Sequence, residues 1–315
     1  MAENDIITAA RYNLLQARMA TIMGNPSDGE GYGQQLESDT VATSSLVRAD
    51  DINGLYTDMI RARKHQTGNI PNSISTVLAN DELFLINDDD SAPYDTTSFT
   101  AFEQAMQDIE ADKFLLALPQ ATVTSLASAS RGSGWNGTIY LEFSLNFPGY
   151  TTENGTVVTA DDHRRAFFNA GGQVYIAPNL TGGSGRKTRD WQDLLSKIAQ
   201  VRFVHDSTQA DAGTGSSIGN YDLTTTYKQL FIKQAELYPV YNENNFKLYA
   251  KRLSTNEIQF KVEFNDDDTG DRTGLGPAVD EAVTGTTTVT VQVLRPSGSS
   301  VNVPAPSYIE RSAFN

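Results

Sequence analysis

Two stretches of the chain alternate between apolar and polar side chains, and this alternation constrains the fold more than any other sequence feature. In residues 138–147 every second side chain is apolar, namely Ile139, Leu141, Phe143, Leu145 and Phe147. Residues two apart share one face of a strand, so this segment would have one apolar face and one polar face. Residues 257–265 follow the same rule, with Ile258, Phe260, Val262 and Phe264 on the apolar face. Residues 246–253 also have strand character and are joined to them by Ser254-Thr255-Asn256. The pattern predicts half-buried strands of an antiparallel sheet, and residues 246–253 and 257–265 are expected to form a hairpin.

The first third of the chain has helical periodicity instead. A helix is expected from a cap at Thr8 to Gly24, with Tyr12, Leu15 and Met19 on one face. A second helix is expected over residues 50–65, closed by Gly68. A third is expected to start near Thr100, which has capping-box spacing to Glu103. These segments predict an N-terminal helix pair followed by a further helix.

The other predicted elements are shorter. In chain order they are a strand at Leu83–Ile86, a loose Ser-, Ala- and Gly-rich boundary from Thr122 to Gly137, a helix at 161–172, a strand at 173–177, a turn at 182–185, a helix capped by Thr188, a strand at 201–205, an ambiguous segment at 221–236 and a last strand at 286–294. From Arg295 the chain contains three prolines and is expected to be extended.

The predicted fold class is α+β: an N-terminal helix pair plus an antiparallel β-rich body with short helices. We expect two regions. Residues 1–130 would form a helix-rich attachment region, and residues 131–315 a β-rich body with an extended C-terminal tail.

Charge and composition exclude several function classes. The chain carries 24 Lys and Arg against 39 Asp and Glu, a net charge of −15. Such a surface repels phosphates and anionic lipids, so neither nucleic acid nor membrane is an expected partner. The chain contains no cysteine, which excludes disulfides and thiolate chemistry. No apolar run approaches the roughly 20 residues needed to cross a bilayer, and the acidic start does not match a signal peptide, so we expect synthesis in the cytosol.

The residues needed for catalysis are sparse. The chain has three histidines, His65, His163 and His205, and each fits a structural role better than a catalytic one. The segment 181–188 resembles a phosphate-binding loop, but Arg186 separates Gly185 from Lys187 and breaks the pattern. We therefore expect no catalytic residues and no cofactor.

An acidic segment at residues 265–271 raises the question of calcium. In an EF-hand register, Gly276 would occupy the position of the bidentate glutamate, so that interpretation fails. A solvated loop is the default interpretation, and no metal is expected, although a calcium site of another type stays open. Tyr32, Tyr94 and Tyr150 lie in predicted loops and are the candidates for exposed aromatic contacts.

One segment resembles a known family. Residues 163–176, His-Arg-Arg-Ala-Phe-Phe-Asn-Ala-Gly-Gly-Gln-Val-Tyr-Ile, are similar to a signature in virion structural proteins of tailed phages, especially contractile-tailed marine cyanophages. Supporting pieces occur in matching order and span most of the chain: Ile7-Thr8-Ala9 with Tyr12-Asn13, residues 31–34, Trp191 with Leu194-Leu195, and residues 301–306. The resemblance implies a non-enzymatic particle component.

The leading hypothesis is therefore a structural protein of a tailed-phage virion, associated with the tail or neck and assembled in the host cytoplasm. Its expected partners are other virion structural proteins and further copies of itself. Phe167 and Phe168 would anchor a helix, and Gly171 and Gly172 would let the chain reverse into a strand. Tyr308, Ile309 and Phe314 in the tail are the candidate interface.

Two alternatives remain: a fibre or appendage that binds a host receptor or surface glycan, and a carbohydrate-active enzyme that uses acidic residues. The position in the particle, the symmetry and the neighbouring subunits are left open by the sequence.

Overall fold

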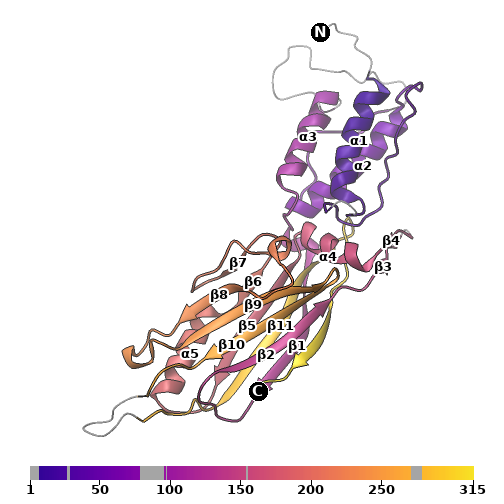
Figure 1. The fold of residues 1–315 in the computed structure, drawn as a ribbon. Coiled ribbons are helices and arrows are strands. Elements are labelled where there is room, and N and C mark those ends of the chain that lie inside the picture. The colour runs from indigo at the N-terminus through magenta and orange to yellow at the C-terminus, as the bar shows by residue number, and fades with distance from the viewer. Residues whose placement is uncertain (1–6, 27–28, 79–95, 97, 154, 271–278) are drawn as a thin grey trace. The chain divides into compact units, whose positions relative to one another are not determined.

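The computed structural model describes the whole chain except residues 1–6, 27–28, 79–95, 97, 154 and 271–278 (Figure 1). Its N-terminal helices and antiparallel β-rich body confirm the α+β prediction. The predicted strand at Leu83–Ile86 and the loop residue Tyr94 lie outside the described residues. None of the described helices is both long and apolar enough to span a bilayer.

The chain forms two compact units, and each is discontinuous in sequence. The first contains residues 1–122, 149–171 and 295–304, and the second contains residues 123–148, 172–294 and 305–315. The chain first passes between them at Thr122/Val123, close to the boundary expected near residue 130. The two later returns to the first unit have no counterpart in the linear division of the sequence.

Three helices form the main body of the first unit: α1 (Ala9–Met23), α2 (Ala49–Thr67) and α3 (Phe99–Ala111). The cap prediction at Thr8 is confirmed, because its side chain accepts the Arg11 backbone N–H. Gly68 ends α2 in the left-handed conformation, at φ 79°. The cap predicted for α3 is wrong: the helix starts one residue earlier than expected, and Ser98 accepts the Ala101 N–H. Ser98 provides the same hydroxyl chemistry two positions upstream of Thr100.

The other parts of the first unit are α4 (Ala160–Asn169), the short hairpin β3 (Tyr150–Thr151) and β4 (Val157–Val158), the turn η1 (Leu118–Gln120) and residues 295–304. His163 Nε2 bonds to the Pro304 carbonyl at 3.0 Å. Gln34 donates to the Asn302 carbonyl at 3.4 Å. These bonds attach the late segment 295–304 to early parts of the chain.

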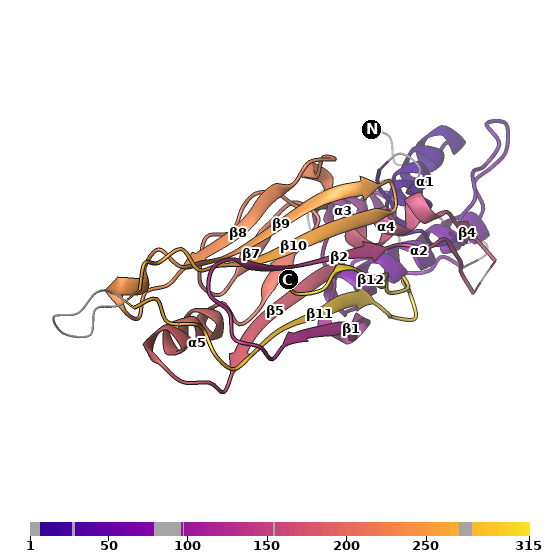
Figure 2. The same ribbon diagram turned by 60° about the horizontal axis from the view of Figure 1, so that its bottom comes forward.

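The second unit is built from two antiparallel sheets (Figure 2). One has the order β1-β11-β5-β6-β7 and the other β12-β2-β10-β9-β8. The strands are β1 (Ala121–Arg131), β2 (Ile139–Asn146), β5 (Gln173–Thr181), β6 (Val201–Phe203), β7 (Thr208–Ala210), β8 (Lys228–Gln234), β9 (Asn245–Ser254), β10 (Glu257–Asn265), β11 (Thr286–Pro296) and β12 (Ser307–Ser312), with turns η2 (Asn220–Asp222) and η3 (Pro239–Tyr241). The predicted β9–β10 hairpin is confirmed, and the ambiguous segment 221–236 contains strand β8.

Aromatic rings fill the space between the sheets. Phe260 stacks on Phe143 at 5.3 Å, and Phe143 stacks on Tyr308 at 5.3 Å, so the row crosses β10, β2 and β12. Phe203 of the other sheet meets Phe260 edge-on at 5.4 Å. The alternating residues of β2 therefore form the core face that their spacing predicts.

Helix α5 (Arg186–Ile198) follows β5 and brings Trp191 to 5.0 Å from Trp135 and 6.0 Å from Phe264. The predicted cap at Thr188 is wrong, since the helix begins at Arg186 and its cap, Gly185, lies three residues earlier. Gly185 has φ 103°, a left-handed conformation that a threonine would adopt only with strain.

The Ser- and Ala-rich segment predicted to be a loose boundary is a strand. Residues 121–131 form β1, which lies at the edge of its sheet beside β11 (Figure 2). None of its residues is buried, so neither face shows the apolar alternation that marks β2. Sequence periodicity depends on a buried face, which is why it gives no signal here.

The two sides of the sandwich end differently. On the β7/β8 side, Thr214 exchanges backbone bonds with Ile232 of β8, and Ser216 with Thr208 of β7. Gly215 makes this possible, because a Cβ there would lie 2.0 Å from the Thr208 carbonyl oxygen. On the β1/β12 side, the part of the chain that the structure describes has no segment with backbone pairs to both edge strands. The link there is made by side chains, because Asn315 accepts from the Arg131 guanidinium of β1 and from the Tyr140 N–H of β2.

Candidate functional site

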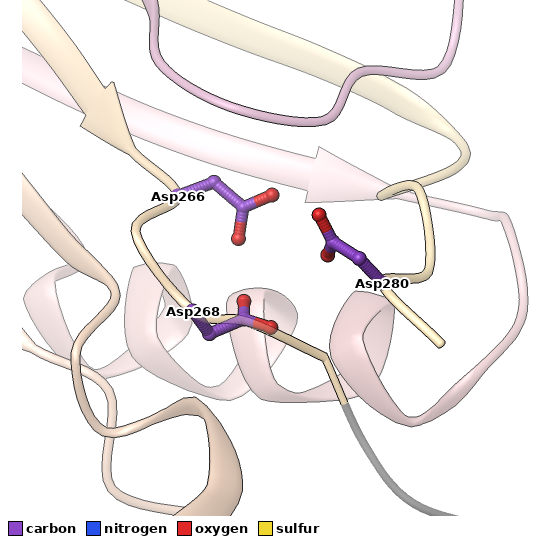
Figure 3. A group of neighbouring side chains, drawn as sticks. All are labelled: Asp266, Asp268 and Asp280. Atoms are coloured by element: carbon purple, nitrogen blue, oxygen red, sulfur yellow. The ribbon is translucent and has the colours of Figure 1, made fainter. Parts of the chain in front are cut away.

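A buried lysine lies among three aspartates in the second unit. Lys187, in the first turn of α5, has its ammonium 3.2 Å from Asp266, 2.9 Å from Asp268 and in contact with Asp280. The side chains of Lys187, Asp266 and Asp268 are fully or almost fully buried, whereas Asp280 is 40% exposed. Figure 3 shows the three carboxylates turned toward one another. The ammonium is therefore their shared counter-ion.

Backbone and amide groups fix the carboxylates. Asp268 accepts Asn244 Nδ2 at 2.7 Å and the Gly270 N–H at 2.7 Å. Asn244 in turn accepts the backbone N–H groups of Asp267 and Asp268. Asp266 accepts the Gly137 N–H at 3.3 Å. The cluster thereby joins α5 to the segment after β10 and the segment before β11.

Burial and charge pull the pKa values of the cluster apart. Burial raises the pKa of Asp266, and its bond to Asp268 adds to the rise. Burial alone would raise the pKa of Asp268 too, but bonds from Asp266, Lys187 and Asn244 outweigh it and lower that pKa. Burial disfavours the charged form of Lys187, yet its bonds to Asp280 and Asp268 leave the pKa raised. The lysine stays protonated, and as pH falls Asp266 takes a proton before Asp268 does.

This geometry corrects the default interpretation of the acidic segment. Asp266 and Asp268 are only 6% and 7% exposed, so a solvated loop is wrong for both residues. One ligand oxygen from each of the three aspartates lies within 4.8 Å of the others, a spacing that could hold a metal ion. The Lys187 ammonium bonds to the same oxygens, so a cation could bind only after the lysine leaves. The chemistry of the donor set thus favours an internal ion pair.

Sequence reasoning missed Lys187 although a signal was present. Lys187, Trp191, Leu194 and Ile198 recur at helical spacing, and all four are buried on α5. A lysine at an apolar position of an amphipathic helix requires an acidic partner. The partners lie 79 or more residues away, and local patterns cannot identify them.

A polar pocket of about 340 Å³ lies within the first unit. Its lining includes Glu37, Arg61, Tyr150, Thr152 and Ser300. Arg61 is already bonded to the Gln35 carbonyl at 2.9 Å and to Asp58 at 3.2 Å. Hydroxyl, amide and carboxylate groups with one aromatic ring form a surface suited to a neutral polyhydroxylated ligand.

The predicted helix anchors are fully buried in the first unit. Phe167 and Phe168 are 0% exposed and meet edge-on at 5.1 Å. Gly171 has φ 77°, and a Cβ there would lie 2.7 Å from Leu116 Cβ and 2.8 Å from the Phe114 carbonyl oxygen. Gly172 follows directly and precedes β5. These residues form a packed chain reversal and contribute no chemical group to a site.

The candidate interface residues belong to strand β12 and the segment after it. Tyr308 stacks on Phe143, and Phe314 lies 5.9 Å from Phe264, so both rings contact their own chain. Ile309 is opposite Ser144 in the register and is partly exposed. The expected tail thus includes a strand paired with β2, and contact of these residues with a neighbour stays a prediction.

The loop and histidine residues have structural partners. Tyr32, predicted to be exposed, is 1% exposed and donates to the Lys113 carbonyl at 2.6 Å, so that prediction is wrong. Tyr150 is half-buried and meets His163 edge-on at 4.9 Å. His65 Nε2 bonds to the Ala170 carbonyl at 3.0 Å. Burial lowers the pKa of His65 to about 4, which keeps its ring neutral.

Fold and site together define an α+β protein with a two-sheet antiparallel sandwich and a buried lysine–aspartate cluster. No known protein family, no curated protein and no solved structure matches the chain.

Proposed function

We propose that this protein is a structural component of a tailed-phage virion, associated with the tail or neck, which acts through subunit interfaces and not through catalysis. Its partners would be other virion structural proteins and further copies of itself. The observation that carries the proposal is the difference between the two sides of the sandwich. One side is closed by residues 214–216, and the other ends in strands β1 and β12.

The buried charged and titratable side chains support the same proposal, because they are bonded to other groups of the chain. The buried lysine is ion-paired with the aspartates around it, and His65 and His163 bond to backbone carbonyls. These groups stabilise the fold and are not free to act on a substrate. The similarity of residues 163–176 to a virion signature adds the particle context.

Quantitative mass spectrometry of purified particles tests this proposal. We expect the protein at a constant copy number per particle, whichever preparation is used. A protein that is abundant in the lysate but absent from purified particles would overturn the proposal.

The polar pocket supports a second candidate, an appendage that binds a surface glycan. Tyr150, one of the loop aromatics proposed to contact a ligand, lines this pocket with Thr152 and Ser300. Glycan-array binding that is lost in Tyr150→Ala would support this role. Unchanged binding in that variant, or no binding by the wild type, would argue against it.

A further inference from the structure

The outer edge of strand β1 has no pairing strand among the described residues. Strand β1 spans 11 residues, lies at the end of the sheet order, and within the described parts of the chain pairs with β11 alone. The outer backbone N–H and C=O groups of an edge strand can pair with another strand. Natural proteins protect such edges with charged residues, prolines, bulges or a covering segment.

The other edges of the sandwich have such protection. Residues 214–216 cover β7 and β8. Strand β12 is six residues long, carries Glu310 and Arg311, and has a register shift between Glu310 and Ser312. Strand β1 contains no proline and no charged residue before Arg131 at its end. Its sequence therefore favours pairing.

Charge indicates which partner β1 can accept. The chain has a net charge of −15, so two copies repel each other over most of their surface. Strand β1 carries no carboxylate, and its one cation, Arg131, is bonded to the Asn315 carbonyl oxygen. Two copies can approach along this edge without bringing carboxylates together.

We propose that β1 pairs antiparallel with β1 of a second copy of this chain, centred on Leu126. This deepens the proposed assembly function, on which it rests, by naming one partner and one interface. The pairing joins two five-stranded sheets into one continuous sheet and uses each edge once, as a two-fold interface requires. Leu126 then faces Leu126, and Val123 faces Ala129. The two Arg131 residues lie at opposite ends, roughly 30 Å apart, whereas parallel pairing would place them side by side.

Cysteine cross-linking tests this register directly, because the natural chain has no cysteine. Directly opposed residues of an antiparallel pair have Cα atoms about 4.5–5.5 Å apart, within disulfide reach. Leu126→Cys should therefore give a covalent dimer under mild oxidation. The matched control is Ser130→Cys on the same strand, which faces residue 122 of the other copy and should remain monomeric on a non-reducing gel.

A charge-swap experiment provides a second readout. Position 125 of one copy faces position 127 of the other, so Ser125→Lys with Ala127→Lys places like charges opposite each other and should abolish the dimer. Ser125→Glu with Ala127→Glu should do the same. An equimolar mixture of the two variants should recover the dimer mass in light scattering. Circular dichroism checks that each variant folds.

The outcomes separate the interface from the function. Cross-linking of both cysteine variants, or of neither, would overturn the antiparallel β1 pairing, as would a wild type that is monomeric at every concentration. If an oligomer survives the charge variants and the protein is present in particles, the β1 interface fails and the assembly role stands. If β1 dimers form but the protein is absent from particles, the interface stands and the assembly role fails.

Discussion

The ammonium of Lys187 lies 2.9 Å from the carboxylate of Asp268, and both side chains are almost fully removed from solvent. The two residues lie on α5 and on the segment after β10, so their ion pair joins distant parts of the second unit. Removing one partner would leave the other charge buried and uncompensated, which costs more than the pair itself contributes.

Lys187→Met should therefore lower the free energy of unfolding by about 3–5 kcal/mol. The matched control is Lys197→Met on the same helix. Lys197 pairs with Asp193 at 2.7 Å but is 43% exposed, and its loss should cost about 0.5 kcal/mol or less. Urea titration of the three proteins measures the difference. Equal midpoints for Lys187→Met and the wild type would contradict the counter-ion role.

Calcium should not stabilise the wild type, because the ammonium occupies the centre of the three carboxylates. We expect the same melting temperature in EDTA and in millimolar calcium chloride. Lys187→Met leaves Asp266, Asp268 and Asp280 without their cation, so calcium should raise its melting temperature. A calcium-dependent rise in the melting temperature of the wild type would show that calcium displaces the Lys187 ammonium from the carboxylates.

His65 should make folding less favourable in acid. Its pKa is about 4 in the folded protein against 6.5 ordinarily, so the unfolded chain binds the proton first as pH falls. Stability is therefore lost between pH 6.5 and about 4 and is unaffected above that window. A pKa difference of about 2.5, at about 1.36 kcal/mol for each pKa unit, corresponds to about 3 kcal/mol.

His65→Gln keeps a donor for the Ala170 carbonyl but has no titrating ring. The stability difference between wild type and His65→Gln should change by about 3 kcal/mol across this window, measured by urea titration at several pH values. His205→Gln is the control and should retain the acid sensitivity of the wild type. A constant difference for His65→Gln would show that the ring is not held neutral.

Phe167→Ala should cost roughly 3–5 kcal/mol, because it removes a fully buried ring and leaves a cavity. Phe314→Ala is the comparison, since that ring is partly exposed and should cost about 1–2 kcal/mol. Thermal melts followed by circular dichroism measure both. A melting curve unchanged by Phe167→Ala would refute its anchoring role.

Comparing Gly171→Ala with Gly155→Ala separates the cost of backbone strain from the cost of a steric clash at the new Cβ. Both glycines have positive φ, 77° and 87°, so each substitution should cost about 1–2 kcal/mol from strain. Gly155 has open space around its Cβ position, whereas Gly171 faces Leu116 and Phe114, which should add about 1–3 kcal/mol. Equal losses in chemical denaturation would mean that residues 114–116 move aside.

Sequence patterns predict the fold where one face of an element is buried. Residues 139–147 alternate because β2 has a core side, and α1 and α2 follow the same logic at helical spacing. Strand β1 has no buried residue and gives no alternating pattern, so its Ser- and Ala-rich sequence predicts a loose boundary instead of a strand. The Lys187 cluster depends on pairing across 79 to 93 residues, which tertiary packing determines.

The interleaved order of the two units has a consequence for biosynthesis. The first unit takes in residues 295–304, and His163 bonds to Pro304 within it. A ribosome must therefore translate as far as residue 304 before this unit can close. The second unit takes in residues 305–315, so every N-terminal fragment that ends before residue 304 lacks part of both units.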